Sequence, residues 1–137
     1  MTEKLQQCIG WNVRKLARLL GQVYDEACRP NGLKNTQFSI LAILSCMGSV
    51  TINKLAGVVG ADRTTMTRNL AILEKQSLIK VTPSKEDPRA RDVSLTNRGR
   101  CVFDSTYPHW AKTQRQLIDG MGEKDWEQFM QLLSKLH

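Results

Sequence analysis

Apolar residues recur every three or four positions between Leu5 and Ala27, which is the spacing of one face of an α-helix. This pattern predicts one long amphipathic helix that ends near Cys28, because Pro30 blocks continuation and Gly32 permits a left-handed turn. Such a helix would be about 37 Å long, more than a small domain can cover with its own core. Part of its apolar stripe therefore needs a partner.

Helices are also predicted on both sides of the centre of the chain. Residues 37–47 form one, capped by Asn35 or Thr36. Another begins at the cap Thr96, and Pro108 inside it should bend the helix at the preceding residue. Two glycines stop that helix, and a last apolar stripe follows: Trp126, Phe129, Met130, Leu133 and Leu136. The terminal stripes are too apolar for free water, so we expect them to pack against a second copy of the chain.

Two short helices joined by a tight turn are predicted at the centre. Residues 52–59 have helical spacing and end at Gly60, and Asp62 has the short acceptor side chain of a helix N-cap. An apolar stripe then recurs at i, i+4 and i+7: Met66, Leu70 and Leu73. Opposite that stripe lie Thr64 and Arg68, so the outer face is hydroxylated and cationic. Such a face fits the major groove of DNA.

A short antiparallel hairpin is predicted after these helices. Residues 78–82 and 92–95 are rich in β-branched side chains, and their apolar positions alternate. Pro83 and Pro88 lie in the intervening segment 83–91, which we therefore expect to be a protruding loop. Two helices followed by a basic hairpin are the elements of a winged helix-turn-helix.

The charge distribution favours a nucleic-acid partner for this segment. The net charge of the chain is +7. Residues 1–50 hold six Lys or Arg and three Asp or Glu, residues 51–100 hold ten and five, and residues 101–137 hold four and five. The positive excess is concentrated around the predicted winged helix-turn-helix, as a polyanion partner requires.

Four segments together resemble one known family. They are ADRTTMTRNL at 61–70, LEK at 73–75, EDPR at 86–89 and VSLTNRG at 93–99. The most specific is the wing, where Asp, any residue and Arg precede a Val-x-Leu-Thr-x-x-Gly junction. This pattern is similar to that of the multiple-antibiotic-resistance regulator (MarR) family, and the resemblance covers nearly the whole chain.

The resemblance implies a mainly α-helical fold with a small β-hairpin wing. Residues 1–137 would form a single domain, with dimerisation helices at 1–34 and 97–137 and a DNA-binding lobe at 35–96. It also implies a homodimer that binds double-stranded DNA at a pseudo-palindromic operator, acts as a transcriptional repressor and is released by a small-molecule effector. A winged-helix protein-interaction module without specific DNA binding is the alternative.

DNA contacts are expected from both the central helix and the wing. The major-groove candidates are Thr64, Thr65, Thr67 and Arg68, with Arg63 and Asn69 near the rim. Arg89 and Arg91 suit the narrow minor groove, whose negative potential attracts guanidinium groups. Lys85 and Arg98 would take phosphates. Asp87 cannot contact phosphate favourably, and in the family the matching acid orients neighbouring arginines.

Other chemistry is weakly represented. Four cysteines lack the spacing of a zinc site: Cys8, Cys28, Cys46 and Cys101. His109 and His137 lie near no nucleophile motif, so we expect no enzyme, metal or cofactor. No apolar run reaches the roughly 20 residues of a membrane span, and no signal peptide begins the sequence. A cytoplasmic protein with free thiols and no membrane contact is therefore expected.

Two mechanisms of release are open. The family binds effectors in the crevice between the dimer helices and the lobe, and five residues would border it: Trp11, Tyr24, Tyr107, His109 and Trp110. They suit a small aromatic or phenolic acid, and equally suit plain packing. The alternative is a redox switch at Cys8, because some relatives sense organic peroxides through an early cysteine. Here Gly10 occupies the reactive position, which favours a buried, structural Cys8.

Overall fold

The computed structural model describes residues 2–137 and contains eight helical segments and three strands. In chain order they are α1 (Thr2–Gln6), α2 (Ile9–Cys28), η1 (Arg29–Asn31), α3 (Asn35–Met47), β1 (Val50–Thr51), α4 (Ile52–Val59), α5 (Arg63–Lys75), β2 (Ile79–Pro83), β3 (Arg91–Leu95), α6 (Asn97–Met121) and α7 (Glu123–Ser134). The fold is mainly α-helical with a small β wing, as the sequence predicts.

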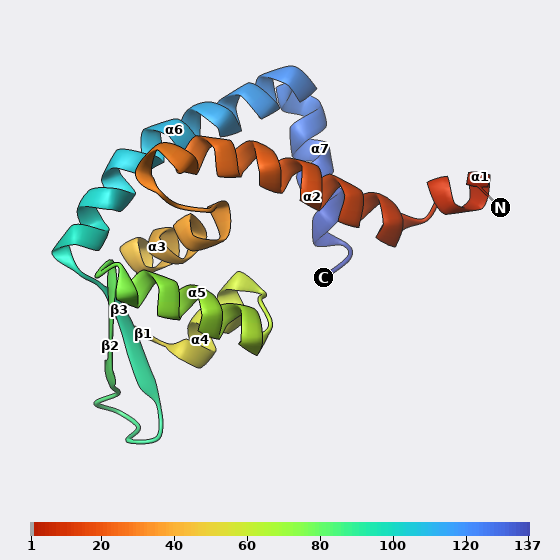
Figure 1. Cartoon of the computed structure of the whole chain (residues 1–137). Coiled ribbons are helices and arrows are strands. Elements are labelled where there is room, and N and C mark those ends of the chain that lie inside the picture. The colour runs from red at the N-terminus through yellow and green to blue at the C-terminus, as the bar shows by residue number, and fades with distance from the viewer. Residues whose placement is uncertain (1) are drawn as a thin grey trace.

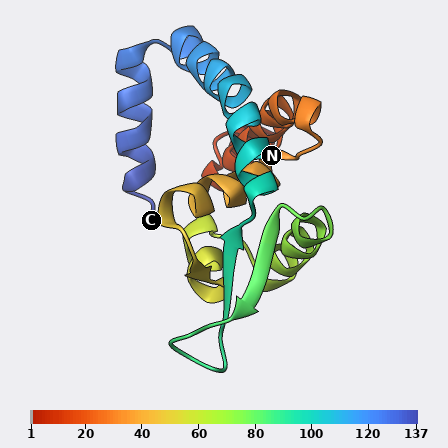
Figure 2. The ribbon, with the colours of Figure 1, turned by 90° about the vertical axis from the view of Figure 1, so that its left-hand side faces the viewer.

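The chain divides into two regions of different shape (Figure 1). α3, α4, α5 and the three strands form a compact lobe, from which the loop between β2 and β3 projects. α2 and α6 lie side by side along the lobe, and α1 extends beyond it. Figure 2 shows α7 folding back from the far end of α6. We call residues 35–95 the lobe, and α1, α2, α6 and α7 together the arm.

The hydrophobic core lies in the lobe. Leu41, Leu55, Leu73 and Val93 are all 0% exposed and come from α3, α4, α5 and β3. α3 buries five of its residues: Gln37, Phe38, Ile40, Leu41 and Leu44. These residues span nearly half of the helix circumference, and α3 packs against α4, α5 and β3, so it is the central element of the lobe.

The wing is a three-stranded antiparallel sheet in the order β1-β3-β2, where the sequence predicts a two-stranded hairpin. The additional strand is β1, in which Val50 pairs with Val93 of β3. A strand of two residues is too short to show an alternating pattern, so the sequence did not reveal it. Pro83, predicted in the loop, is the last residue of β2. It is tolerated there because β2 is an edge strand.

The single long helix predicted at the start of the chain is wrong. α1 and α2 are separated at Cys8, which adopts an extended conformation (φ −69°, ψ 118°). The Asn12 side chain donates hydrogen bonds to the carbonyls of Gln6, at 2.6 Å, and of Cys8, at 3.0 Å. The freed carbonyl of Gln6 thus finds a side-chain donor in place of a helical N–H. Gly10 further weakens the helix at this point.

The cap predicted for α3 is also wrong. Neither Asn35 nor Thr36 occupies the cap position, because α3 starts at Asn35 and Lys34 precedes it. The carboxylate of Asp25 in α2 instead accepts a hydrogen bond from the Asn35 backbone N–H at 2.7 Å. A carboxylate at this end satisfies a free N–H and complements the helix dipole. The arm therefore holds the first turn of the lobe.

α6 continues through Pro108 as one helix of 25 residues. Proline cannot donate a backbone hydrogen bond, and hydroxyls in the turn before it bond backward to the helix. The Thr106 hydroxyl donates to the Val102 carbonyl at 2.7 Å, and that of Ser105 to Cys101 at 2.9 Å. The helix therefore curves along α2 without breaking (Figure 1).

Candidate nucleic-acid interface

The cap and the apolar stripe of α5 fix which of its sides faces outward. The Asp62 carboxylate accepts a hydrogen bond from the Thr65 backbone N–H at 2.7 Å, which confirms the predicted cap. This bond holds the pKa of Asp62 below its usual value. Met66 and Leu73 of the predicted stripe are 1% and 0% exposed. Their burial against the lobe core turns the opposite side of α5 to the solvent.

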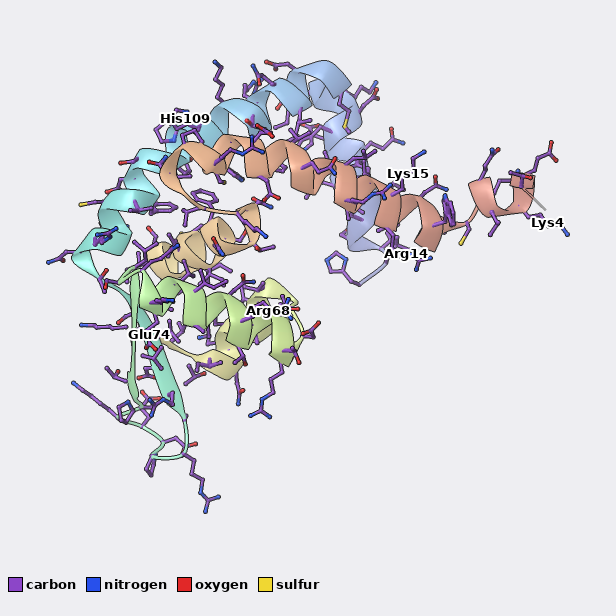
Figure 3. All side chains as sticks on the ribbon, in the orientation of Figure 1. Lys4, Arg14, Lys15, Arg68, Glu74 and His109 are labelled. Carbon is purple, nitrogen blue, oxygen red and sulfur yellow. The ribbon has the colours of Figure 1, made fainter. Side chains whose placement is uncertain are left out.

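The outward side of α5 is hydroxylated and cationic. Four of the predicted DNA-contact residues line one shallow hollow: Arg63, Thr64, Thr67 and Arg68. All four are exposed, and Figure 3 labels Arg68 on this helix. Thr65 and Asn69 are half-buried and lie toward the flank of the helix. The Thr67 hydroxyl donates to the Arg63 carbonyl at 2.8 Å, so its oxygen is left as an acceptor.

The wing loop is shaped by backbone hydrogen bonds and by Asp87. The Asp87 carboxylate accepts a hydrogen bond from the Arg89 backbone N–H at 2.9 Å, and the Ser84 N–H donates to the Ala90 carbonyl at 3.0 Å. These bonds close the loop and leave the side chains of Arg89 and Arg91 exposed. Asp87 thus braces the loop through the backbone; within residues 2–137 it makes no ion pair with an arginine side chain.

A groove of about 370 Å³ lies where α4, α5 and the wing loop meet. Arg63, Arg89 and Arg91 all line it, so the fold brings the predicted helix and wing residues together. Three guanidinium groups around one hollow concentrate positive potential there. Thr51 and Asn53 also line the groove, and sequence reasoning missed both. For Thr51 the sequence offered one signal, because threonine is a typical cap for the helix predicted at 52–59. In the structure its hydroxyl accepts a hydrogen bond from the Lys54 backbone N–H at 3.2 Å.

Lys85 and Arg98 lie apart from this groove. Lys85 lines a second hollow of about 660 Å³ along β2 and β3, together with Lys54 and Lys80. Arg98 is exposed in the first turn of α6, at the other end of β3 from Arg91. Neither residue therefore shares the groove that α5 and the wing loop form, and their contacts with phosphates stay a prediction.

Three of the five predicted effector residues form a stack, and the other two lie apart from it and from each other. Trp110 stacks on Tyr24 and on Tyr107, with ring centroids 6.0 Å apart in both pairs. His109, labelled in Figure 3, lines a hollow of about 430 Å³ between α2 and α6. Trp11 is 49% exposed near the start of α2. The structure therefore brings three of the five residues together, and their role in effector binding stays a prediction.

The cysteines differ sharply in exposure. Cys8 is exposed, so the expectation of a buried, structural Cys8 is wrong; residues 2–19 are all exposed, because this end of the arm extends beyond the lobe (Figure 1). Cys28 is 0% exposed, and burial, with a contribution from Asp25, raises the pKa of its thiol to about 11. Cys46 and Cys101 are exposed. Within residues 2–137 no cluster of His, Cys, Asp and Glu side chains could hold a metal ion, and no helix is long and apolar enough to cross a membrane.

Comparisons with known proteins agree with this geometry. A family model described as the MarR family matches residues 33–90. The transcriptional regulator MosR of M. tuberculosis, solved in complex with DNA, is 37% identical with a TM-score of 0.85, over 95% of this chain and 93% of that one. The HTH-type transcriptional regulator YwaE of Bacillus subtilis is 29% identical over 123 residues, which are 90% of this chain and 72% of YwaE.

A more distant structure shares the fold. A mutant MarR from E. coli, complexed with operator DNA, is 20% identical and matches with a TM-score of 0.85. The match covers 93% of this chain and 92% of that one. The winged helix-turn-helix arrangement is therefore common to chains whose sequences have largely diverged.

Proposed function

Because this chain belongs to the MarR family and is a DNA-binding transcriptional regulator, not an enzyme, we propose that it is a homodimeric repressor. Two copies of α5 and the wing bind the half-sites of a pseudo-palindromic operator, and a small-molecule effector releases the dimer. The observation that supports DNA binding most directly is the groove at which Arg63, Arg89 and Arg91 meet beside the outward side of α5.

The residues of the interface divide by the part of DNA that they reach. Thr64, Thr67 and Arg68 face the bases of the major groove, with Arg63, Thr65 and Asn69 at its rim. Arg89 and Arg91 enter the adjacent minor groove. Lys85 and Arg98 neutralise phosphates, while Asp87 keeps the wing loop in shape.

The exposed apolar stripe of the arm supports a homodimer. Ile9, Val13 and Leu16 follow one another at i, i+4 and i+7 on α2 and are 64%, 47% and 40% exposed. An apolar stripe of this extent is unusual on a monomeric surface. A second copy of the arm is the natural occupant, because a palindrome is read by two recognition helices about 34 Å apart, one turn of DNA.

Repression and release require little beyond this geometry. A dimer that occupies promoter DNA blocks transcription by position alone, whereas activation needs a further contact with the polymerase. An aromatic or phenolic acid that prefers the DNA-incompetent arrangement by about 1 to 3 kcal/mol would weaken operator affinity roughly 5- to 150-fold. The candidate contacts are the five predicted residues: Tyr24, Tyr107 and Trp110, which stack together, and Trp11 and His109, which lie apart from that stack.

A thiol switch at Cys8 is the second candidate for release, because this cysteine is exposed. The two mechanisms differ in one variant. Under the effector mechanism, Cys8→Ser keeps both operator binding and release by an aromatic acid. Release of the wild type by sub-stoichiometric organic peroxide, absent in Cys8→Ser, would establish the thiol switch instead.

The proposed function is tested by selecting bound sequences from a random duplex pool. A sequence-specific dimer enriches an inverted repeat, whereas a protein-interaction module enriches nothing. Arg68→Ala should then lose roughly 1 to 3 kcal/mol on the enriched site and relax its base preference. Lys85→Ala should weaken cognate and scrambled duplexes alike, and equal losses for both variants on both duplexes would contradict the assignment of Arg68.

A further inference from the structure

Aromatic side chains are concentrated where the arm meets the lobe. The chain has three Trp, two Tyr and three Phe, and five of these eight form one stacked group. We call this group the joint cluster: Tyr24, Phe38, Phe103, Tyr107 and Trp110. In a chain that is only 6% aromatic, this concentration marks the place where packing is most specific.

The joint cluster links three helices through one side chain of the lobe. Phe38 of α3 is 3% exposed. It stacks on Phe103 and Trp110 of α6, with ring centroids 5.5 Å and 5.8 Å away and interplanar angles of 17° and 30°. Trp110 also stacks on Tyr24 of α2, whose hydroxyl donates a hydrogen bond to Gln114 of α6. The ring of Phe38 is therefore held against α6, and Tyr24 joins α2 to the same cluster through Trp110.

Polar contacts hold both ends of the same lobe helix. At its start, Asp25 of α2 accepts the hydrogen bond from the Asn35 backbone at 2.7 Å. At its end, the guanidinium of Arg100 in α6 donates to the hydroxyl of Ser45. α3 is thus fixed to the arm at its first residue, in its first turn by the joint cluster, and near its last turn. A helix held at three points along its length has a fixed orientation.

We propose that the joint cluster sets the spacing of operator half-sites that the dimer accepts, with Trp110 as the positioning residue. The inference rests on the proposed function, since spacing has meaning only for a dimer on two half-sites. One added base pair moves a half-site by about 3.4 Å along the axis and turns it by roughly 35°. A lobe with fixed orientation cannot follow this displacement, whereas a lobe that can rock on its arm follows part of it.

The test measures affinity for the enriched operator and for duplexes with one base pair added or removed between the half-sites. The wild type should lose about tenfold or more in affinity on the altered duplexes, as for a mismatched site. Trp110→Ala empties the centre of the joint cluster, so the loss should fall to about threefold or less, with the base preference within each half-site unchanged. Trp110→Phe keeps a stacking ring and should restore most of the spacing preference.

A matched control separates orientation from stability. Val93→Ala truncates a residue of β3 that is 0% exposed and takes no part in the aromatic stacking, so it should lower the melting temperature without changing the spacing preference. Should Trp110→Ala fail to fold by circular dichroism, Phe103→Leu takes its place with the same expected result.

The outcomes distinguish this inference from the proposed function. A wild type that enriches no paired half-sites overturns both. Enrichment of an inverted repeat, with a folded Trp110→Ala that keeps the full wild-type spacing penalty, overturns only the role of the joint cluster. An equal loosening of the spacing preference in Val93→Ala would also overturn it, because general destabilisation would then be the cause.

Discussion

The lobe and the arm are built from helices with similar apolar stripes, yet they differ in how completely those stripes are covered. In the lobe, Leu55 and Leu73 are 0% exposed. In the arm, Val13 and Leu16 lie on the apolar stripe of α2, as Leu55 and Leu73 lie on those of α4 and α5, yet they are 47% and 40% exposed. The same helical periodicity therefore corresponds to a fully buried stripe in the lobe and to a solvent-exposed stripe in the arm. In the proposed homodimer a second copy covers the stripe of the arm, so the two regions should respond differently to mutation and to protein concentration.

The largest effect should come from placing a charge on the arm stripe. Val13→Asp puts a carboxylate where the partner's apolar side chains would pack, so we expect monomers by ultracentrifugation. Operator affinity should fall by about 100-fold or more, because one lobe alone binds one half-site without the gain of a linked second site. Gln22→Asp adds the same charge on another side of α2 and is the control. A dimeric Val13→Asp with wild-type affinity would show that this stripe is not the interface.

Truncating each stripe sharpens the comparison further. Leu55→Ala in the lobe should cost about 2 to 5 kcal/mol of unfolding free energy, because it leaves a cavity in a closed core. Leu16→Ala in the arm should cost less in the monomer, and its effect should grow with protein concentration as the dimer forms. Denaturant titrations at two protein concentrations check both. A concentration-independent loss for Leu16→Ala would mean that the arm folds without a partner.

The same contrast shows which parts of the fold a sequence can predict. The elements of the lobe follow from local signals, such as the Asp62 cap and the stripe of α5, and the structure confirms them. β1 could not be predicted, because a strand of two residues shows no periodicity. The hydrogen-bond acceptor at the start of α3 could not be predicted, because this acceptor, Asp25, lies on a different helix. The break at Cys8 could not be predicted from the apolar pattern, because it depends on the Asn12 side chain, which bonds to a carbonyl of the preceding helix.

The candidate site likewise contains features that the local sequence predicts and features that depend on tertiary packing. The outward position of Thr64 and Arg68 follows from 100° per residue once the buried stripe of α5 is known. The groove shared by Asn53 and Arg91 depends on how α4 packs against the wing, which no local pattern encodes. The stacking of Phe38 in the joint cluster is likewise a product of tertiary structure, because its partners lie far along the chain.

A smaller contrast is the thiol reactivity of exposed cysteines and of the buried cysteine where the arm meets the lobe. Cys28, at the end of α2, has a thiol pKa raised to about 11 by burial, whereas Cys8, Cys46 and Cys101 are exposed. At pH 8 a thiol reagent reacts with the thiolate, so Cys28 should be labelled roughly 100-fold more slowly than an ordinary exposed cysteine. Peptide mass spectrometry over a time course checks this. Labelling of Cys28 at the rate of Cys101 would mean that the junction between the arm and the lobe opens readily.

The smallest expected effect concerns the charge at the start of α5. Asp62→Asn keeps a capping acceptor but removes the carboxylate, so the difference in unfolding free energy from the wild type reports the charge alone. The pKa of Asp62 is lowered in the folded protein by the hydrogen bond from the Thr65 backbone. A lowered folded-state pKa means that the stabilisation is fully present above the unfolded value of about 3.9. It is lost as the pH falls through the folded pKa.

The wild type should therefore be slightly more stable than Asp62→Asn near neutral pH, and the two should converge below pH 4 or so. Thermal unfolding across this pH range measures the difference. Glu127→Gln removes one carboxylate from the middle of α7, where it cannot cap a helix, and should show no comparable convergence. Because Asp62 is exposed, added salt should weaken the effect. A stability difference that instead grew as the pH fell would mean that the neutral carboxyl group, and not the anion, is the better cap for α5.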